Sequence, residues 1–375
     1  MNVLTVENLS KTYGMTQALN DVSFECKEGE FFTLFGPSGA GKTTILELIA
    51  GMKSDYQGRI SIRGRPLEGM AMQNRNIAMA FEDYALYPHM TVEENISFPL
   101  RSPRAPKRSV AEIRKKVQWT ADELDIGHLL ERNPVQLSGG QKQRVALARA
   151  LVREADVYLL DEPIAHLDAK LRTVARANLK AMANNLGATI IYVTHDFREA
   201  LGLSDRLLIL NQGKVLQIDE PRKVYAKPAT DFVGRLLGDP VMNMVDGLLR
   251  KSENGMTLLA GGVTLKLNAH LSQEAEDRLK AGSDKARLGI RPSGVQVHLE
   301  DPGNATALPV YTIEHSADHL LVYFEIAGVY FGGICPAHTD LSMGQQVWIR
   351  LDENRGHLFD ATFDLDTSSV AEDAA

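Results

Sequence analysis

The sequence predicts an α/β domain built around a glycine-rich loop, followed by a smaller domain made of β-strands. Three observations support this prediction. A glycine-rich loop at residues 36–44 lies between an apolar run and a helical pattern, strand and helix patterns then alternate up to residue 210, and short strand patterns dominate beyond residue 238. Such alternation indicates a parallel sheet covered by helices, and closely spaced short strands indicate a barrel or sandwich.

The length and composition are those of a folded protein with two domains. The 375 residues exceed the roughly 250–300 at which single cores usually divide. Hydrophobic residues make up 44% of the chain and charged residues 24%, as in globular proteins generally. The formal net charge of −7 argues against a nucleic-acid partner, because surfaces that follow phosphates carry an excess of lysine and arginine.

Membrane-spanning, secretory and cysteine-based features are not predicted. No apolar run approaches the roughly 18 residues that a spanning helix needs, and the first residues lack the pattern of a signal peptide. We therefore expect a cytoplasmic chain whose attachment to a membrane is indirect. Cys26 and Cys335 lie far apart in the sequence, so we expect two buried, reduced thiols and neither a disulfide nor a cysteine metal site.

The first domain is predicted to begin with two strands, at residues 4–9 and 18–26, joined by a turn at 11–16 that contains Tyr13. The apolar run at 31–35 predicts a buried strand that leads into the glycine-rich loop. The loop fits the pattern G-x-x-x-x-G-K-[ST], whose fixed positions are occupied by Gly36, Gly41, Lys42 and Thr43.

The residue types of this loop suit a phosphate. Glycines such as Gly39 adopt positive φ and let successive backbone N–H groups point into one concavity. The helix that follows adds the positive end of its dipole, Lys42 adds a cation, and the Thr43 hydroxyl can bind Mg²⁺. An ordinary glycine turn is the alternative, but it leaves the lysine and threonine in register unexplained.

A helical subdomain, placed at about residues 84–150, is predicted after two short strands at 58–63 and 77–81. Thr91 and Glu94 have the spacing of a capping box, and helical periodicity dominates residues 109–130. The basic segment before this periodicity, at 101–108, is predicted to be an exposed connector, although its charge could meet an acidic partner.

A second glycine turn, Leu137-Ser138-Gly139-Gly140-Gln141, leads directly into an alanine-rich helix. Its helix N-terminus offers another set of free N–H groups for an anion. Because one nucleotide already occupies the first loop, we expect this second turn to serve a different phosphate.

Acidic residues follow the apolar run at 157–160, which predicts a central parallel strand. Ligands bind at the carboxyl ends of such strands. Two adjacent carboxylates are costly there without a cation, so Asp161 is predicted to hold Mg²⁺ through water and Glu162 to orient a water molecule. Two solvent-exposed acids are the alternative. His195 ends the next predicted strand, at 189–194, which favours a functional role over a structural one.

Beyond residue 238, short alternating runs predict the second domain, at 239–365. The runs lie at 256–260, 263–267, 288–290, 295–299, 308–313, 320–326, 329–332 and 346–351. Residues 366–375 lack apolar periodicity, and we expect them to form a disordered tail.

Together these motifs resemble the ATP-binding-cassette (ABC) ATPases over nearly the whole chain. The Leu137 to Gln141 turn followed by Asp161-Glu162-Pro163 is the most specific part of the resemblance. Residues 84–92 are similar to the carbohydrate-importer branch, typified by the maltose-importer ATPase. Residues 289–292 resemble part of its oligonucleotide/oligosaccharide-binding-type (OB-fold-like) regulatory domain. The resemblance implies a nucleotide-binding domain at 1–238 and a regulatory domain at 239–365.

The resemblance also implies ATP and Mg²⁺ as cofactors and assigns roles to residues. Tyr13 would stack on adenine, Glu162 would polarise the attacking water, and His195 would contact the γ-phosphate. Mg²⁺ would be held by Thr43, Glu82 and, through water, Asp161. The phosphates would be held by Ser38, Gly39, Ala40, Gly41, Lys42, Thr43 and Thr44. The residues that would close over ATP bound to another subunit are Ser138, Gly139, Gly140 and Gln141, with Asp168 crossing the same interface.

The partners implied by the resemblance are a second ATPase subunit, identical or not, two transmembrane permease subunits, and indirectly an extracytoplasmic solute-binding protein. The chain would sit peripherally on the cytoplasmic face of the inner membrane and energise import of sugars, polyols or related phosphorylated solutes. The helical insert and residues 82–92 would carry closure to the permease. The alternatives are an ABC subunit for another solute, a soluble ABC ATPase of repair or translation, and a kinase with the same phosphate loop.

Three positions depart from the family pattern. Glu82 replaces the usual glutamine, and Ala165 and His166 replace the usual serine and asparagine. An ionised glutamate only accepts hydrogen bonds, whereas glutamine also donates them. Because Glu162 and His195 are in place, we expect an active site with an altered rate or coupling. Glu82 would take part in it, and its carboxylate could hold Mg²⁺ more firmly yet repel the γ-phosphate.

Overall fold

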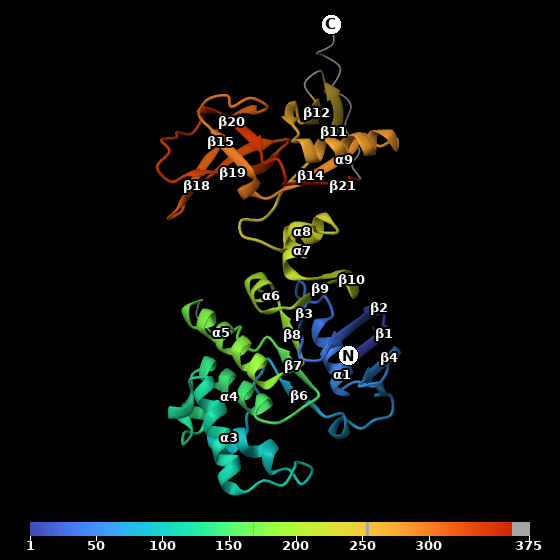
Figure 1. The fold of residues 1–375 in the computed structure, drawn as a ribbon, viewed down its shortest axis with the longest axis vertical. Helices are drawn as coiled ribbons and strands as arrows, with labels where there is room; N and C mark the ends of the chain where they lie inside the picture. Colours follow the sequence, from blue (N-terminus) through green and yellow to red (C-terminus); the bar gives the residue numbers. More distant parts are fainter. Residues whose placement is uncertain (168, 253–254, 362–375) are drawn as a thin grey trace. The chain divides into compact units, whose positions relative to one another are not determined.

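The computed structural model describes residues 1–167, 169–252 and 255–361 (Figure 1). The chain divides into two compact units, Met1–Ala226 and Lys227–Ala375, so the division falls before the boundary placed at residue 238 from the sequence. The predicted disordered tail at 366–375 lies outside the described residues. Among the described residues, no helix is long and apolar enough to cross a membrane.

A small antiparallel sheet begins the first unit, with strand order β2-β1-β4-β5. Its strands are β1 (Asn2–Tyr13), β2 (Thr16–Lys27), β4 (Gln57–Ile62) and β5 (Arg65–Pro66). Tyr13 pairs with Thr16, so the hairpin turn is only Gly14 and Met15 and is shorter than the turn predicted at 11–16. Gly14 has φ of 56°, a left-handed conformation that glycine adopts without steric cost. Tyr13 is therefore held at the end of a strand.

The central sheet of the first unit has the strand order β10-β9-β3-β8-β7-β6. Its strands are β3 (Phe31–Phe35), β6 (Ile77–Ala80), β7 (Val157–Asp161), β8 (Ile190–Thr194), β9 (Arg206–Asn211) and β10 (Lys214–Asp219). All neighbours are parallel except the antiparallel edge strand β10. Every residue of β3, β7 and β8 is buried, which explains their continuous apolar runs.

The helices of the first unit include those predicted after the phosphate loop, within the helical subdomain and after the second glycine turn. They are α1 (Lys42–Ala50), α2 (Val92–Ser97), α3 (Val110–Glu123), α4 (Gly139–Leu151), α5 (Ala169–Leu186), α6 (Phe197–Leu203) and α7 (Pro221–Ala226). Short 3₁₀ turns accompany them at Met72–Asn74, Phe98–Arg101, Gly127–Leu129 and Pro134–Gln136. The predicted capping box of Thr91 and Glu94 starts α2, with both reciprocal hydrogen bonds formed.

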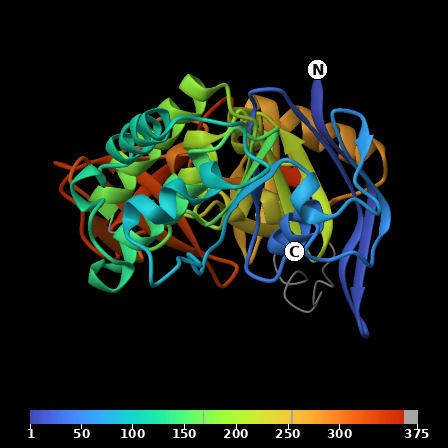
Figure 2. The same cartoon turned by 90° about the horizontal axis from the view of Figure 1, so that it is seen from below.

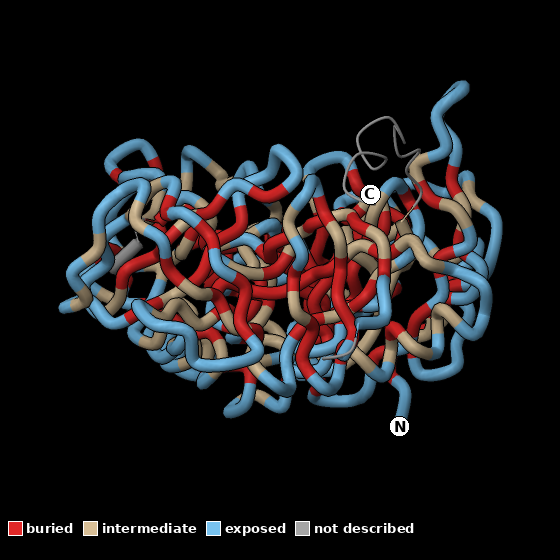
Figure 3. The backbone as a smooth tube through the Cα atoms, turned by 90° about the horizontal axis from the view of Figure 1, so that it is seen from above, coloured by how far each residue is buried: buried red, intermediate tan, exposed pale blue. Residues whose placement is uncertain are grey.

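Two apolar layers cover the central sheet, one on each face. In Figures 1 and 2, α3, α4 and α5 lie on one side of this sheet, and the small sheet with α1 lies on the other. Phe31 and Phe32 are neighbours in β3 but pack into different layers, because successive strand residues point to opposite faces. Figure 3 shows buried and exposed segments following one another along the backbone.

The second unit contains two sheets, with strand orders β13-β12-β11-β14-β21 and β16-β20-β15-β19-β18-β17. The first sheet consists of β11 (Asn243–Ser252), β12 (Gly255–Ala260), β13 (Val263–Lys266), β14 (Lys285–Ile290) and β21 (His357–Phe359). The second consists of β15 (Val295–His298), β16 (Thr306–Pro309), β17 (Thr312–His315), β18 (His319–Ile326), β19 (Val329–Pro336) and β20 (Gln346–Leu351).

The second unit differs from the strand prediction in three respects. Strands β11 and β21 lie outside the predicted runs. The run at 308–313 is divided between β16 and β17, which pair with different neighbours. The unit also contains helices, α8 (Asp231–Leu236) and α9 (Ala269–Lys280), and a 3₁₀ turn at Pro292–Gly294. In α9, Leu271 and Ala275 are buried at helical spacing, a pattern too sparse to stand out among polar residues.

Candidate functional site

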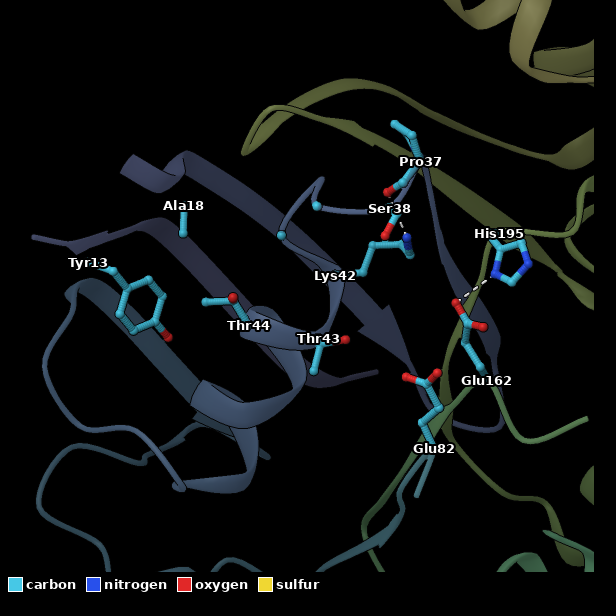
Figure 4. Close-up of a pocket in the computed structure, with 12 residues that line it drawn as sticks. Tyr13, Ala18, Pro37, Ser38, Lys42, Thr43, Thr44, Glu82, Glu162 and His195 are labelled. Atoms are coloured by element: carbon cyan, nitrogen blue, oxygen red, sulfur yellow. Dashed lines mark hydrogen bonds and ion pairs between the residues drawn. The ribbon is translucent and has the colours of Figure 1, made fainter. Parts of the chain in front are cut away.

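A cavity of about 680 Å³ opens at the carboxyl edge of the central sheet, where the loops after β3, β6, β7 and β8 meet (Figure 4). Its lining consists of Tyr13, Ala18, Pro37, Ser38, Gly39, Gly41, Lys42, Thr43, Thr44, Glu82, Glu162 and His195. The structure thus brings together residues that the sequence spreads over more than half of the first unit. Ala18 and Pro37 belong to the lining but were not among the predicted site residues.

The glycine-rich loop has the backbone that its sequence predicts. Gly39 and Gly41 have φ of 76° and 107°. A Cβ atom on Gly36 would clash with the Leu210 carbonyl, and one on Gly41 would lie 2.8 Å from the Ala18 carbonyl oxygen. A close backbone contact therefore requires glycine at Gly36, conformation favours it at Gly39, and both apply at Gly41. Helix α1 starts directly after the loop and directs its first N–H groups towards the cavity.

Lys42 is folded back along this loop and is only 6% exposed. Its ammonium group donates hydrogen bonds to the carbonyl oxygens of Gly36 at 2.8 Å and Pro37 at 2.9 Å. Burial lowers the pKa of Lys42, and the nearby carboxylates of Glu162, Asp161 and Glu82 oppose that shift. A phosphate group in the cavity would offer this cation a stronger acceptor than a neutral carbonyl.

Asp161 ends β7 and is 4% exposed. Burial raises the pKa of its carboxyl group to about 6, a hydrogen bond with the Thr43 side chain opposes the shift, and Glu162 and Glu82 add to it. Its Oδ1 atom is buried and has no hydrogen-bond partner among the described residues. An unpaired carboxylate oxygen beside a threonine hydroxyl fits a hard cation such as Mg²⁺, which takes oxygen ligands.

Glu162 and His195 form a pair across the ends of β7 and β8. The Glu162 Oε1 and His195 Nδ1 atoms are 2.8 Å apart, and Figure 4 shows both side chains on the same side of the cavity as Glu82, opposite Tyr13. Glu162 has φ of 46°, an uncommon conformation for a residue with a side chain. Its N–H group donates to the Val193 carbonyl at 3.1 Å, which ties this strained residue to the neighbouring strand.

Gln143 in α4 also holds Glu162, and sequence reasoning did not find it. The buried Gln143 side chain donates from Nε2 to the Glu162 carbonyl oxygen at 2.9 Å and accepts from the His166 N–H group at 3.3 Å. Strained conformations persist where surrounding contacts determine them. The sequence carries no local signal for this role, because Gln143 stands between Lys142 and Arg144 in the polar first part of α4.

The loop that carries Glu82 is anchored by two further residues that the sequence analysis did not single out. Asn95 in α2 is fully buried and donates to three carbonyl oxygens of the loop, those of Tyr87, Met90 and Thr91. Arg149 in α4 donates to the carbonyl oxygens of Tyr84 at 2.9 Å and Ala85 at 2.8 Å. Glu82 itself is exposed and lines the cavity.

The second glycine turn does not line this cavity. Ser138 caps α4, with its hydroxyl accepting from the Gln141 N–H group and its own N–H group donating to Gln141 Oε1. Gly140 faces Leu167, whose side chain would lie 2.6 Å from a Cβ atom at that position. Ser138, Gly139, Gly140 and Gln141 are therefore built as a helix N-terminus separate from the phosphate loop of the same chain. The predicted interface residue Asp168 lies outside the described residues.

Comparison with known proteins decides the family. Residues 19–165 match the ABC transporter family. The trehalose/maltose import ATP-binding protein MalK of Thermococcus litoralis is 39% identical over an alignment that covers 94% of this chain and 96% of that protein. The chain belongs to the ABC transporter family.

Other members of the ABC transporter family support the same assignment. The sn-glycerol-3-phosphate import ATP-binding protein UgpC of Psychromonas ingrahamii is 37% identical, with 96% of this chain and 94% of that protein covered. A solved structure of the dimeric ATP-binding cassette MJ0796, bound to ADP and Pi after hydrolysis, is similar with a TM-score of 0.54 and 31% identity. It covers 58% of this chain and 99% of that chain.

Membership confirms the resemblance and the α/β fold predicted for the first domain. The chain is an ATP-binding subunit of an ABC transporter and an ATPase. The roles assigned to individual side chains remain predictions.

Proposed function

We propose that this chain is the ATP-hydrolysing subunit that energises an importer for a sugar, a polyol or a related phosphorylated solute. The observation that supports the proposal most directly is the convergence of Lys42, Glu162 and His195 on one cavity, with Asp161 buried beside Thr43. The chain that carries them is similar over nearly its whole length to import ATP-binding proteins. Because the similarity includes the second unit, it favours an importer over a soluble ABC ATPase, as does the net charge of −7.

ATP would lie along the cavity from Tyr13 to Glu162. The Tyr13 ring, 40% exposed at the end of β1, offers a face on which adenine can stack. Residues 38–44 would surround the phosphates with backbone N–H groups and the Lys42 ammonium group. Thr43, Glu82 and Asp161 would hold Mg²⁺, which when bound neutralises charge on the phosphates.

Glu162 would act on the water that attacks the γ-phosphate, and His195 would contact the γ-phosphate itself. A carboxylate fixed beside the end of the phosphate loop can accept a hydrogen bond from that water and orient it in line with the bond that breaks. His195 shares a hydrogen bond with Glu162 at 2.8 Å, which restricts the direction of the carboxylate. Phosphoryl transfer requires positioning and charge stabilisation more than covalent chemistry, and these contacts supply both.

A complete site would require two chains. Ser138, Gly139, Gly140 and Gln141 form a helix N-terminus outside their own cavity, so they can close over ATP bound to a second ATPase subunit. Two subunits would then enclose two nucleotides head to tail, with Asp168 crossing the interface. The similar MJ0796 cassette is dimeric in its solved structure.

The membrane partners would be two transmembrane permease subunits, which in turn receive solute from an extracytoplasmic solute-binding protein. The chain would sit peripherally at the cytoplasmic face of the membrane. The loop at 82–92 and the helical insert would transmit closure, because Arg149 and Asn95 tie that loop to α4 and α2.

Copurification tests the proposal. The full chain, tagged and extracted from its native membranes in a mild detergent, should carry two polytopic membrane proteins in a complex with two ATPase subunits. Solute delivered by a binding protein should then stimulate ATP hydrolysis after reconstitution into vesicles. Recovery with ribosomes or DNA, and without membrane proteins, would contradict the proposal.

A further inference from the structure

A buried carboxylate lies beneath the turn that carries His195. Glu199 in α6 is 2% exposed, and the chemistry proposed above does not use it. Its Oε2 atom accepts hydrogen bonds from the Tyr192 hydroxyl at 2.8 Å and the Thr194 hydroxyl at 2.7 Å. Burial raises the pKa of Glu199, and these two bonds oppose the shift. Burying a carboxylate costs free energy unless hydrogen-bond donors compensate for the lost water. The buried position of Glu199 therefore indicates a role in the structure around it.

The Thr194 hydroxyl connects this carboxylate to the turn. It donates to Glu199 and accepts from the Asp196 N–H group at 3.0 Å. Thr194 is the last residue of β8 and Asp196 is the N-cap of α6. His195 is the single residue between them. The hydrogen bonds from Thr194 to Glu199 and from Asp196 to Thr194 therefore fix the backbone on both sides of His195, on the buried side of the turn.

The Asp196 side chain fixes the same turn from the outside. Its Oδ1 atom accepts from the Arg198 N–H group at 2.7 Å, and its Oδ2 atom accepts from Arg172 at 3.1 Å. The His195 side chain is 60% exposed, so packing restrains the imidazole little. Its placement 2.8 Å from Glu162 therefore depends on the backbone of the turn.

We propose that Glu199 is a positioning residue that acts through the Thr194 hydroxyl to hold His195 against Glu162. The inference rests on the role proposed for His195. Tyr192 allows a comparison with Thr194, because the Tyr192 hydroxyl donates to the same Glu199 oxygen but lies two residues before the turn. Loss of that hydroxyl removes a bond to the carboxylate and leaves the path from Glu199 to Asp196 in place.

The test compares variants of the full-length chain by steady-state ATP hydrolysis with Mg²⁺ and by thermal unfolding. Thr194→Val and Glu199→Leu should each lower kcat about ten- to a hundredfold with little change in KM for ATP, because small displacements of catalytic groups slow the chemistry while the phosphate loop is untouched. The double variant should be no slower than the slower single variant, since both changes break one path. Glu199→Gln should recover most of the turnover, because its carboxamide oxygen accepts both hydroxyls.

Tyr192→Phe is the matched control. It should lower the unfolding temperature about as much as Thr194→Val does, and it should keep kcat near that of the unmodified chain. The positioning role is wrong if Thr194→Val loses stability and keeps its turnover, or if Tyr192→Phe loses as much turnover as Thr194→Val. These two outcomes decide the question even if Glu199→Leu does not fold. If His195→Ala hydrolyses ATP normally, the role proposed for His195 is wrong as well, which separates that failure from a failure of the inference about Glu199.

Discussion

At the scale of single residues, the fold shifts the pKa of Asp161, the acid at the end of β7 beside Thr43. Burial raises its pKa from the ordinary value near 3.8 to about 6. A carboxyl group whose pKa is raised in the folded state favours folding at low pH, and this stabilisation is lost as the pH rises from about 4 through about 6. At neutral pH the ionised Asp161 therefore destabilises the chain until a cation compensates its charge.

Asp161→Asn should make the chain more stable and insensitive to Mg²⁺. The expected gain in the free energy of unfolding at pH 7.5 without Mg²⁺ is about 3 kcal/mol, and it should narrow at pH 5, where the folded wild-type carboxyl group is largely protonated. Thermal unfolding at the two pH values, with and without Mg²⁺ and ATP, measures both effects. Equal stability at pH 7.5, or a difference that does not depend on pH, would contradict the assignment.

Glu82→Gln should change how the site uses Mg²⁺. The Glu82 carboxylate lines the cavity and adds to the negative charge around Asp161. Replacing it should raise the Mg²⁺ concentration for half-maximal ATP hydrolysis about two- to fivefold, as expected for an exposed charge, and should tighten ATP binding. The control is Asp83→Asn, which removes the neighbouring acid. Unchanged turnover and Mg²⁺ dependence in Glu82→Gln would mean that the glutamate has no special role.

At the scale of elements, α4 connects three parts of the site. Its N-terminus is the capped glycine turn, its Gln143 holds the strained Glu162, and its Arg149 holds the loop that carries Glu82. Tyr84 and Ala85 have φ of 65° and 41°, and left-handed conformations of this kind cost roughly 1–2 kcal/mol each. Arg149 offsets that cost by binding both carbonyl oxygens.

Arg149→Lys should therefore loosen the loop at residues 82–92. A single ammonium group cannot reproduce the two parallel bonds of a guanidinium group, so we expect a loss of about 1–3 kcal/mol in local stability. Hydrogen exchange followed by mass spectrometry should show faster exchange in this loop and unchanged protection in the central strands. Arg153→Lys is the control, because Arg153 lies four residues further on, just beyond the end of α4, and donates to the Asn76 side chain. Unaltered exchange in the loop would rule out the anchor.

At the scale of the whole molecule, the turn at Ser138 matters only if two chains meet. Ser138→Arg should lower ATP turnover on the order of 10²–10³-fold by blocking closure over the partner's ATP, while binding of a single nucleotide remains intact. The dependence of the rate on protein concentration and nucleotide binding by titration measure the two properties separately.

Ser109→Arg is the matched control for that experiment. Ser109 caps α3 through the same capping box that Ser138 forms at α4. Either substitution should cost about 1 kcal/mol in stability through the lost cap, and only Ser138→Arg should lose turnover. Normal turnover by Ser138→Arg, or a rate strictly proportional to protein concentration, would argue against a shared site.

Much of the first unit was predictable because its signals are local. The buried strands β3, β7 and β8 are continuous apolar runs, the phosphate loop is a contiguous motif, and the capping boxes of Thr91 and Ser138 involve residues three apart. In contrast, Asn95, Gln143, Arg149 and Glu199 act through carbonyl oxygens and hydroxyls on other elements, which leave no mark in the neighbouring sequence.

The sequence by itself determined the main strands of the first unit, the phosphate loop and the acidic strand end, because these depend on near neighbours and on fixed spacing along the chain. Only the tertiary structure decided that Glu162 faces His195, that Asp161 keeps a buried oxygen without a described partner, and that the Ser138 turn lies outside its own cavity. The physical reason is that a parallel sheet brings the ends of distant strands to one edge, and burial at that edge sets the charge and direction of each side chain.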